Sequence, residues 1–174
     1  MNYIKSCGFV VYKRINNENF YLIIQSLNGD IGFPKGHMES GETELRTAIR
    51  ELKEETNIDV RVIPNFKRQI EYELLNISNT IKQAVYFLGE CVSDNLICQE
   101  TEVAKANFLT YEKALELLTF EETKNILKDA EYYISCIYSK SCYQKADSGV
   151  SESALYIVLN YLRLFSMKSA ARSI

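Results

Sequence analysis

The most constraining feature of this sequence is a glycine-bearing loop that runs directly into a strongly acidic helix, in residues 36–58. Over residues 43–56 apolar side chains recur at helical spacing, which predicts a helix. Thr43 or Ser40 is available as its N-cap, because a side-chain oxygen there can accept from the first free N–H groups. Asn57, which tolerates the left-handed conformation, is available just past the C-terminal end.

This helix carries a stripe of carboxylates beside its apolar face, formed by Glu44, Glu51, Glu54 and Glu55. At about 100° per residue they fall within roughly a third of the circumference. Like charges one turn apart repel each other by a few tenths of a kcal/mol per pair, so the stripe is either a solvated surface or a site that holds a cation. The spacing of Glu51 and Glu55 suits Mg²⁺, which typically binds one or two carboxylates together with substrate phosphates.

The loop before the helix, residues 28–43, favours the cation site. It holds four of the seven glycines and one of the two prolines of the chain, which indicates structured turns. Lys35 and His37 flank Gly36, and a point charge with a hydrogen-bond donor beside free backbone N–H groups can bind a phosphate chain. His37, the single histidine, is also a candidate general base, although its place beside Lys35 favours contact with substrate.

Loop and helix together resemble the Nudix box, Gly-x5-Glu-x7-Arg-Glu-U-x-Glu-Glu-x-Gly-U, where U is a bulky aliphatic residue. The matching positions are Gly36, Glu42, Arg50, Glu51, Leu52, Glu54, Glu55 and Ile58. Asn57 replaces the last glycine, a mild departure because asparagine is the next most tolerant residue of positive φ. From about Cys7 to Ile134 the chain most resembles the asymmetric diadenosine tetraphosphate hydrolases, or bis(5'-nucleosyl)-tetraphosphatases. Residues 7–12, 34–37, 66–68 and 86–88 carry this similarity.

The resemblance implies an α/β (α+β) chain with the Nudix fold, an α/β/α sandwich on a mixed sheet. The hydrophobic pattern agrees with it. We expect strands at residues 6–13, 20–25, 60–63, 66–75 and 83–92, with Pro64 and residues 76–79 at breaks. Further helices are expected at residues 111–118 and 121–138.

The resemblance also implies site residues. The ligands of a divalent metal would be Gly36, through its carbonyl, Glu51, Glu54, Glu55 and Glu102, the last from a loop after the final strand. Glu100 is the alternative to Glu102. Arg50 joins the three box glutamates in the catalytic set and, with Glu42, would brace the loop against the helix. The general base would be Glu51 or Glu102, and the sequence leaves both open.

The substrate-binding residues implied are Lys35, His37, Tyr86, Tyr72 and Lys67. Tyr86 resembles the family tyrosine that lines the nucleotide pocket, while Tyr72 and Lys67 are weaker candidates for base stacking and phosphate contact. Alternatives remain for two of them. Tyr86 is equally well explained as a strand aromatic in the core, and Lys67 as a solvated surface lysine.

We expect residues 1–138 to form the catalytic domain and residues 139–174 a C-terminal extension with an additional helical segment. Residues 154–165 are apolar and helix-like but too short to span a bilayer, which takes about 20 apolar residues, so a helix docked on the domain or on a partner chain is favoured over an interfacial membrane anchor. A net charge of -3 argues against a stable nucleic-acid or membrane partner. Five cysteines without a C-x-x-C pair fit reduced thiols, and the chain lacks a secretory signal pattern, so we expect a cytoplasmic monomer or homodimer.

The functional hypothesis is a Nudix hydrolase that uses Mg²⁺, with Mn²⁺ as a substitute, to cleave a phosphoanhydride bond of a nucleoside polyphosphate. The resemblance points to diadenosine tetraphosphate, split into ATP and AMP. Two alternatives stay open. One is another Nudix reaction, on RNA 5' ends or nucleoside triphosphates, and the other is a Nudix module that senses nucleotides without cleaving them.

Overall fold

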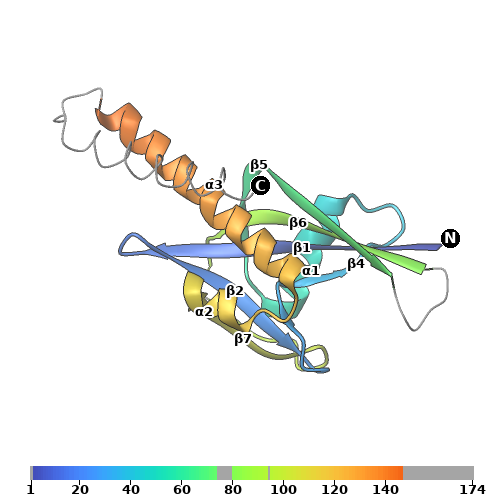
Figure 1. The fold of residues 1–174 in the computed structure, drawn as a ribbon. Coiled ribbons are helices and arrows are strands. Elements are labelled where there is room, and N and C mark those ends of the chain that lie inside the picture. The colour runs from blue at the N-terminus through green and yellow to red at the C-terminus, as the bar shows by residue number, and fades with distance from the viewer. Residues whose placement is uncertain (1, 74–79, 94, 147–174) are drawn as a thin grey trace, which may run out of the picture. The chain divides into compact units, whose positions relative to one another are not determined.

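The computed structural model describes residues 2–73, 80–93 and 95–146 (Figure 1). Its strands are β1 (Asn2–Ile15), β2 (Glu18–Ser26), β3 (Ile31–Gly32), β4 (Lys35–His37), β5 (Val60–Glu73), β6 (Thr80–Cys91) and β7 (Val103–Thr110). Its helices are α1 (Glu44–Thr56), α2 (Tyr111–Leu117) and α3 (Glu121–Ala146). The chain divides after Glu131 into two compact units, and the first of them contains β1 to β7, α1 and α2.

The strands form one mixed sheet in the order β3-β2-β1-β6-β5, with β4 beside β1 and β7 beside β2. β1 and β6 run parallel, from the pair Asn2–Thr80 to the pair Tyr12–Glu90, and the other neighbours are antiparallel. β1 is long enough to pair with β4 through its first half and with β2 through its last residues. The predicted mixed sheet is confirmed, and β1 lies at its centre.

Helix α1 begins and ends where the sequence predicts. The side chain of Thr43 accepts a hydrogen bond from the N–H of Arg46 at 3.3 Å, which caps the N-terminus. Asn57 has a φ of 57°, and its N–H donates to the carbonyl of Lys53 at 2.9 Å. Asparagine tolerates this left-handed conformation, so the departure from the glycine of the Nudix box does not disturb the end of the helix.

The apolar face of α1 packs on one face of the sheet. The buried residues of this core are Cys7, Phe9 and Val11 of β1, Leu22 and Ile24 of β2, Val85 of β6, Val103 and Ala106 of β7, Ala48 and Leu52 of α1, and Ile58. The odd-numbered residues of β1 therefore face α1. Because side chains alternate along a strand, its even-numbered residues lie on the opposite face.

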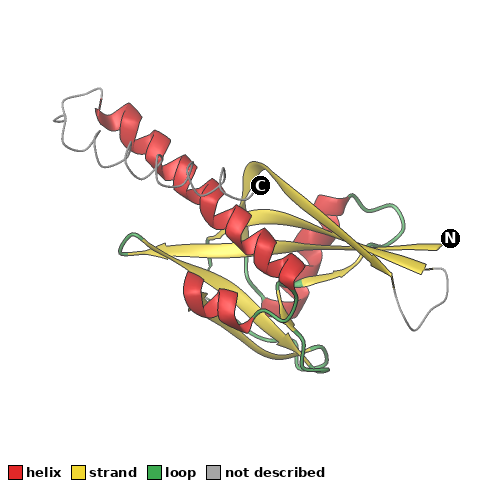
Figure 2. Ribbon diagram, in the orientation of Figure 1, coloured by secondary structure: helices red, strands yellow, loops and turns green. Residues whose placement is uncertain are grey.

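Helix α3, in its portion up to Glu131, contacts that opposite face. The side-chain amide of Asn19 donates to the Glu131 carboxylate at 3.0 Å, and the hydroxyl of Tyr21 donates to the same oxygen. Arg68 of β5 donates to the carboxylate of Asp129 at 2.6 Å. Helices thus lie on both faces of the sheet, as the α/β/α prediction required (Figure 2).

Four strands, β3, β4, β5 and β7, differ from the prediction. The loop of residues 28–43 contains β3 and β4, which are too short to show an alternating pattern. β5 is continuous rather than two strands, because Pro64 lies at an irregularity between Ile63 and Lys67, where Asn65 has a φ of 62°. β7 was not predicted, since its sequence is poor in β-branched residues and its formation depends on pairing with β2.

The C-terminal part also differs. Helix α3 continues to Ala146, past the helix end predicted at residue 138, so the polar composition from Ser139 onward does not end the helix. The helix predicted at residues 154–165 lies outside the described residues. Within residues 2–73, 80–93 and 95–146, no helix has the length and apolar character needed to cross a membrane.

Candidate active site

A close approach between β4 and α1 forms the centre of the candidate site. Gly36 pairs with Cys7 in the sheet, and a Cβ added at Gly36 would lie 2.0 Å from the carboxylate carbon of Glu51. Any residue with a Cβ at this position would overlap Glu51. Glycine has none, so the Glu51 carboxylate can lie directly against the backbone of β4. Packing of the loop on the helix thus brings together Gly36 and Glu51, the first and fourth specified positions of the box.

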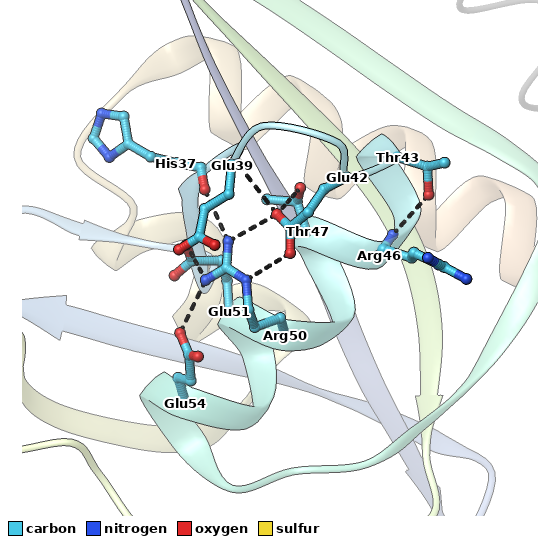
Figure 3. Close-up of polar contacts among 9 residues, drawn as sticks. All are labelled: His37, Glu39, Glu42, Thr43, Arg46, Thr47, Arg50, Glu51 and Glu54. Atoms are coloured by element: carbon cyan, nitrogen blue, oxygen red, sulfur yellow. Dashed lines mark hydrogen bonds and ion pairs between the residues drawn. The ribbon is translucent and has the colours of Figure 1, made fainter.

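Arg50 joins the loop to the helix (Figure 3). Its Nε donates to Glu42 Oε1 at 2.8 Å, and its Nη2 donates to Glu42 Oε2 and to the carbonyl of His37, both at 3.0 Å. Thr47 Oγ1 also donates to Glu42 Oε2 at 2.7 Å. These contacts are the brace that the resemblance implied for Arg50 and Glu42. Hydrogen bonds from Arg50 and Thr47 lower the pKa of Glu42 to about 2.

The same guanidinium holds two of the proposed metal ligands. Its Nη1 donates to Glu51 Oε1 at 2.9 Å and to Glu54 Oε2 at 3.0 Å. Over the described ranges, no three His, Cys, Asp or Glu side chains are gathered closely enough to hold a metal ion. In this arrangement the positive charge of Arg50 offsets the negative charges of Glu51 and Glu54, a role that a bound metal ion could also fill.

Glu55 is the most buried of the acidic residues, with 5% of its surface exposed. The backbone N–H of Lys35 donates to its Oε2 at 2.9 Å, which fixes the carboxylate beside the loop. Burial raises the pKa of Glu55 to about 8, and the charges of Glu51 and Glu102 add to the effect. Burial also raises the pKa of Glu51, against the opposing effect of Arg50.

These residues fit a divalent cation. Carboxylate oxygens are the ligands that hard cations such as Mg²⁺ prefer, and both buried carboxylates have a raised pKa, with the charge of Glu51 adding to the effect of burial on Glu55. Gly36 leaves room for the Glu51 carboxylate directly against its backbone. A positive charge placed among them would remove the repulsion that now favours the protonated acids.

Glu102 lies immediately before β7, not after the final strand as the resemblance implied. Its carbonyl accepts from the N–H of Leu27 at 3.2 Å, and its charge acts on Glu51, Glu55 and His37. The structure therefore brings Glu102 toward the box helix. Glu100, the alternative, lies in the exposed turn that precedes it.

Positive side chains gather on the sheet face opposite α1. Lys35 pairs with Gly8, His37 with Ser6 and Lys82 with Ile4, all even-numbered positions of β1. Partial burial and then the charges of Lys82 and Lys35 lower the pKa of His37, while burial and Lys35 lower the pKa of Lys82. Lys82 was not among the site residues predicted from the sequence. It lies 45 residues along the chain from His37, so only the register of β6 beside β1 could have revealed it.

The two candidate tyrosines differ in exposure. Tyr86 is 1% exposed and packs edge-on against Phe33, with ring centroids 5.7 Å apart. In this conformation it is a core aromatic, and its ring has no free face for a base. Tyr72 is 41% exposed and pairs with Lys82, so it can offer a face to a ligand held by the lysines.

Lys67 lies away from the other candidate substrate residues. It pairs in register with Phe87, whose ring contacts Phe9 of the α1 core, and so faces the α1 side of the sheet. There its ammonium forms an ion pair with Glu44. The structure does not bring Lys67 beside Lys35 and Lys82.

The comparisons with known proteins agree with this geometry. Residues 7–130 match the NUDIX domain family, and the chain belongs to that family. It is 28% identical over 143 residues to the bis(5'-nucleosyl)-tetraphosphatase [asymmetrical] of Mus musculus, covering 75% of this chain and 95% of that protein. A solved structure of a C. elegans Ap4A hydrolase binary complex superposes with a TM-score of 0.70 at 24% identity, covering 76% of this chain and 98% of the other.

Another solved structure, the NUDIX domain of Shewanella oneidensis NrtR complexed with ADP ribose, has a TM-score of 0.61 at 15% identity and covers 77% of this chain and 90% of that chain. Similarity to solved structures at 24% and 15% sequence identity shows the fold alone. Family membership nevertheless makes the chain a pyrophosphohydrolase with a nucleotide substrate, and Nudix hydrolases generally use divalent metal ions.

Proposed function

We propose that this protein hydrolyses diadenosine tetraphosphate to ATP and AMP with Mg²⁺ as its metal ion. The observation that carries the proposal is the placement of Lys35, His37 and Lys82 on one sheet face, while the backbone of β4, which carries Lys35 and His37, contacts the buried carboxylates of Glu51 and Glu55. A long polyphosphate needs several positive contacts in addition to a metal site. The similarity to asymmetrical bis(5'-nucleosyl)-tetraphosphatases over most of both chains supports the choice of substrate.

In this proposal the phosphate chain is bound by Lys35, Lys82 and His37, and Tyr72 offers a face to one base. Glu51, Glu54, Glu55 and Glu102, with the Gly36 carbonyl, would hold the metal. Bound Mg²⁺ would neutralise charge that develops on the phosphate oxygens. Arg50 keeps the loop against α1, and its hydrogen bonds to Glu51 and Glu54 would give way when the cation takes its place.

The chemical step needs a proton acceptor but no protein nucleophile. Water forms a new P–O bond at the outer-but-one phosphorus. The bond from that phosphorus to the anhydride oxygen breaks, AMP leaves with this oxygen, and the proton of the water passes to a carboxylate. Glu51 and Glu102 both lie in the cluster that could accept it. A pH–rate profile of Glu102→Gln separates them, because loss of the acid limb would assign the proton to Glu102.

The direct test is incubation with diadenosine tetraphosphate and Mg²⁺, followed by chromatographic identification of the products. ATP and AMP in equal amounts are expected. Two molecules of ADP, or no cleavage, would overturn the proposal. Nucleoside triphosphates and 5'-triphosphorylated RNA, assayed in parallel, would identify another Nudix reaction by a higher kcat/KM.

Glu55→Gln tests whether the protein is an enzyme or a nucleotide sensor. The variant should lose at least about a hundredfold in kcat, because a buried ligand is removed, while it retains nucleotide binding. Glu116→Gln, at an exposed position of α2, is the matched control and should keep full turnover. A parent protein that binds the nucleotide without cleaving it would support the sensor instead.

We further propose that the protein works in the cytoplasm. The support is that, among the described residues, Cys7, Cys98 and Cys136 are thiols rather than halves of disulfides, as expected of a reducing compartment. Localisation of a fluorescent fusion in the source cells would test this.

A further inference from the structure

Ser6 is a buried residue whose hydroxyl has no partner. It is 1% exposed, and across the part of the chain that the structure describes its Oγ is the one buried side-chain polar atom that makes no hydrogen bond. A buried hydroxyl normally makes at least one hydrogen bond, and a serine hydroxyl usually finds a nearby carbonyl or a water molecule. A buried hydroxyl without a hydrogen bond at a candidate site therefore suggests that its partner is a bound ligand.

The strand register places Ser6 at the centre of the positive side chains. It lies opposite His37 of β4 on one side and opposite Ala84 of β6 on the other. Residues opposite each other in an antiparallel pair, such as Ser6 and His37, have Cβ atoms about 5 Å apart, and diagonal neighbours lie about 7–8 Å apart. Lys35 and Lys82 are the diagonal neighbours of Ser6, one on each flanking strand.

Two of the neighbours of Ser6 on this face, Gly8 and Ala84, are small. Gly8 pairs with Lys35, and a Cβ added at Gly8 would lie 2.5 Å from the Cβ of Lys35 and 2.1 Å from the carbonyl oxygen of Pro34. Ala84 is likewise small and fully buried. Because Gly8 and Ala84 add little or no side chain beside Ser6, a ligand held by the lysines could approach the backbone and the Ser6 hydroxyl closely.

We propose that Ser6 Oγ donates a hydrogen bond to a non-bridging phosphate oxygen of the nucleoside polyphosphate bound by Lys35, His37 and Lys82. This role rests on the proposed function and adds a substrate-binding residue to it. The hydroxyl supplies a short, directional donor where the lysines supply charge. The Ser6 hydroxyl therefore contributes more to the position of the polyphosphate in the site than to the electrostatic attraction that holds it there.

The experiment is isothermal titration of the full chain with methylene-bridged diadenosine tetraphosphate in the presence of Mg²⁺, for the parent and for Ser6→Ala. The dissociation constant of the variant should rise about tenfold, as expected when a hydrogen bond to a charged group is removed. With hydrolysable substrate KM should rise by a similar factor and kcat should change less than about twofold. The melting temperature of the free variant should stay unchanged or rise, because an unsatisfied buried hydroxyl is removed.

Ser93→Ala is the matched control. The Ser93 hydroxyl accepts from the N–H of Asp59 at 2.9 Å, just beyond the end of β6 that is remote from Lys82. Its removal should lower the melting temperature slightly and leave binding unchanged. A Ser6→Ala variant with a lower melting temperature and an unchanged dissociation constant would overturn the role of Ser6, since that pattern belongs to a purely structural hydroxyl.

The two proposals fail in different ways. If the parent binds the tetraphosphate analogue and Ser6→Ala binds it equally well, Ser6 has no substrate role while the proposed function stands. If the parent releases products other than ATP and AMP but the variant still loses affinity for the methylene-bridged analogue, the substrate assignment fails and the Ser6 contact stands. If no nucleotide polyphosphate binds the parent, both are overturned.

Discussion

At the scale of single residues, Gly36 shows how one hydrogen atom decides whether a site can form. A Cβ there would overlap the Glu51 carboxylate, which is the mobile end of a side chain rather than rigid backbone. Gly36→Ala should therefore leave the fold intact and displace Glu51, with a loss of about a hundredfold in kcat, as for a catalytic group misplaced by about 1 Å. Steady-state kinetics and a thermal melt would measure the two effects separately.

Gly32→Ala is the control for this substitution, because a Cβ at Gly32 meets no atom within 4 Å. It should keep the activity of the parent. Full activity in Gly36→Ala would show that Glu51 does not need its position against β4.

The sequence and the structure favour different lysines for phosphate contact. Lys67 was a candidate for phosphate contact, but it pairs with Glu44 on the α1 side, whereas Lys82 lies on the face of Lys35 and His37. Lys82→Gln should raise KM for the polyphosphate about tenfold, because a charged hydrogen bond is lost. Lys67→Gln should change KM less than about twofold. The reverse result would return the phosphate site to the α1 side of the sheet.

At the scale of elements, the brace between the loop and α1 depends on the charge of Glu42. Its hydrogen bonds from Arg50 and Thr47 hold the pKa near 2, below the ordinary value of 4.5. Stability from a lowered acidic pKa is fully present above the ordinary value and is lost as pH falls through the folded value. The contribution of Glu42 should therefore disappear between about pH 4.5 and about pH 2.

Thermal melts of the parent and Glu42→Gln over this pH range would test the prediction. The variant should melt at a lower temperature than the parent at pH 6, and the difference should shrink as the pH falls. Glu121→Gln, which changes an exposed carboxylate paired with Lys124 in the first turn of α3, is the control. A difference between parent and Glu42→Gln that is independent of pH would contradict a role for the Glu42 charge.

At the scale of the whole catalytic unit, α3 is attached to the sheet through a partly buried carboxylate. Tyr21 is fully buried, and its hydroxyl and the Asn19 amide both donate to Glu131. Tyr21→Phe would leave Glu131 with one donor fewer, so the free energy of unfolding should fall by about 1–2 kcal/mol in urea titration. Asp129→Asn, which breaks the exposed pair with Arg68, should cost less than about 1 kcal/mol. Equal losses would mean that burial of the Glu131 contact contributes nothing.

The sequence by itself determined the parts of this protein that depend on local pattern. The limits of α1 follow from Thr43, Asn57 and helical spacing, and the box of glutamates follows from residues within one loop and one helix. The mixed sheet and the two later helices were also predictable from runs of apolar residues. These features need only neighbouring residues in the chain, so physical rules of short range suffice for them.

The tertiary structure decided which distant residues meet. β7 forms because β2 offers an edge, and Lys82 and Ser6 join Lys35 and His37 because β6 runs parallel to β1 in one register. The same register removes Lys67 from the site and buries the ring of Tyr86. If the pairing of β6 with β1 shifted by one residue, every side chain of β6 would move to the other face of the sheet. The local sequence of β6 does not indicate which strand pairs with it or in which register.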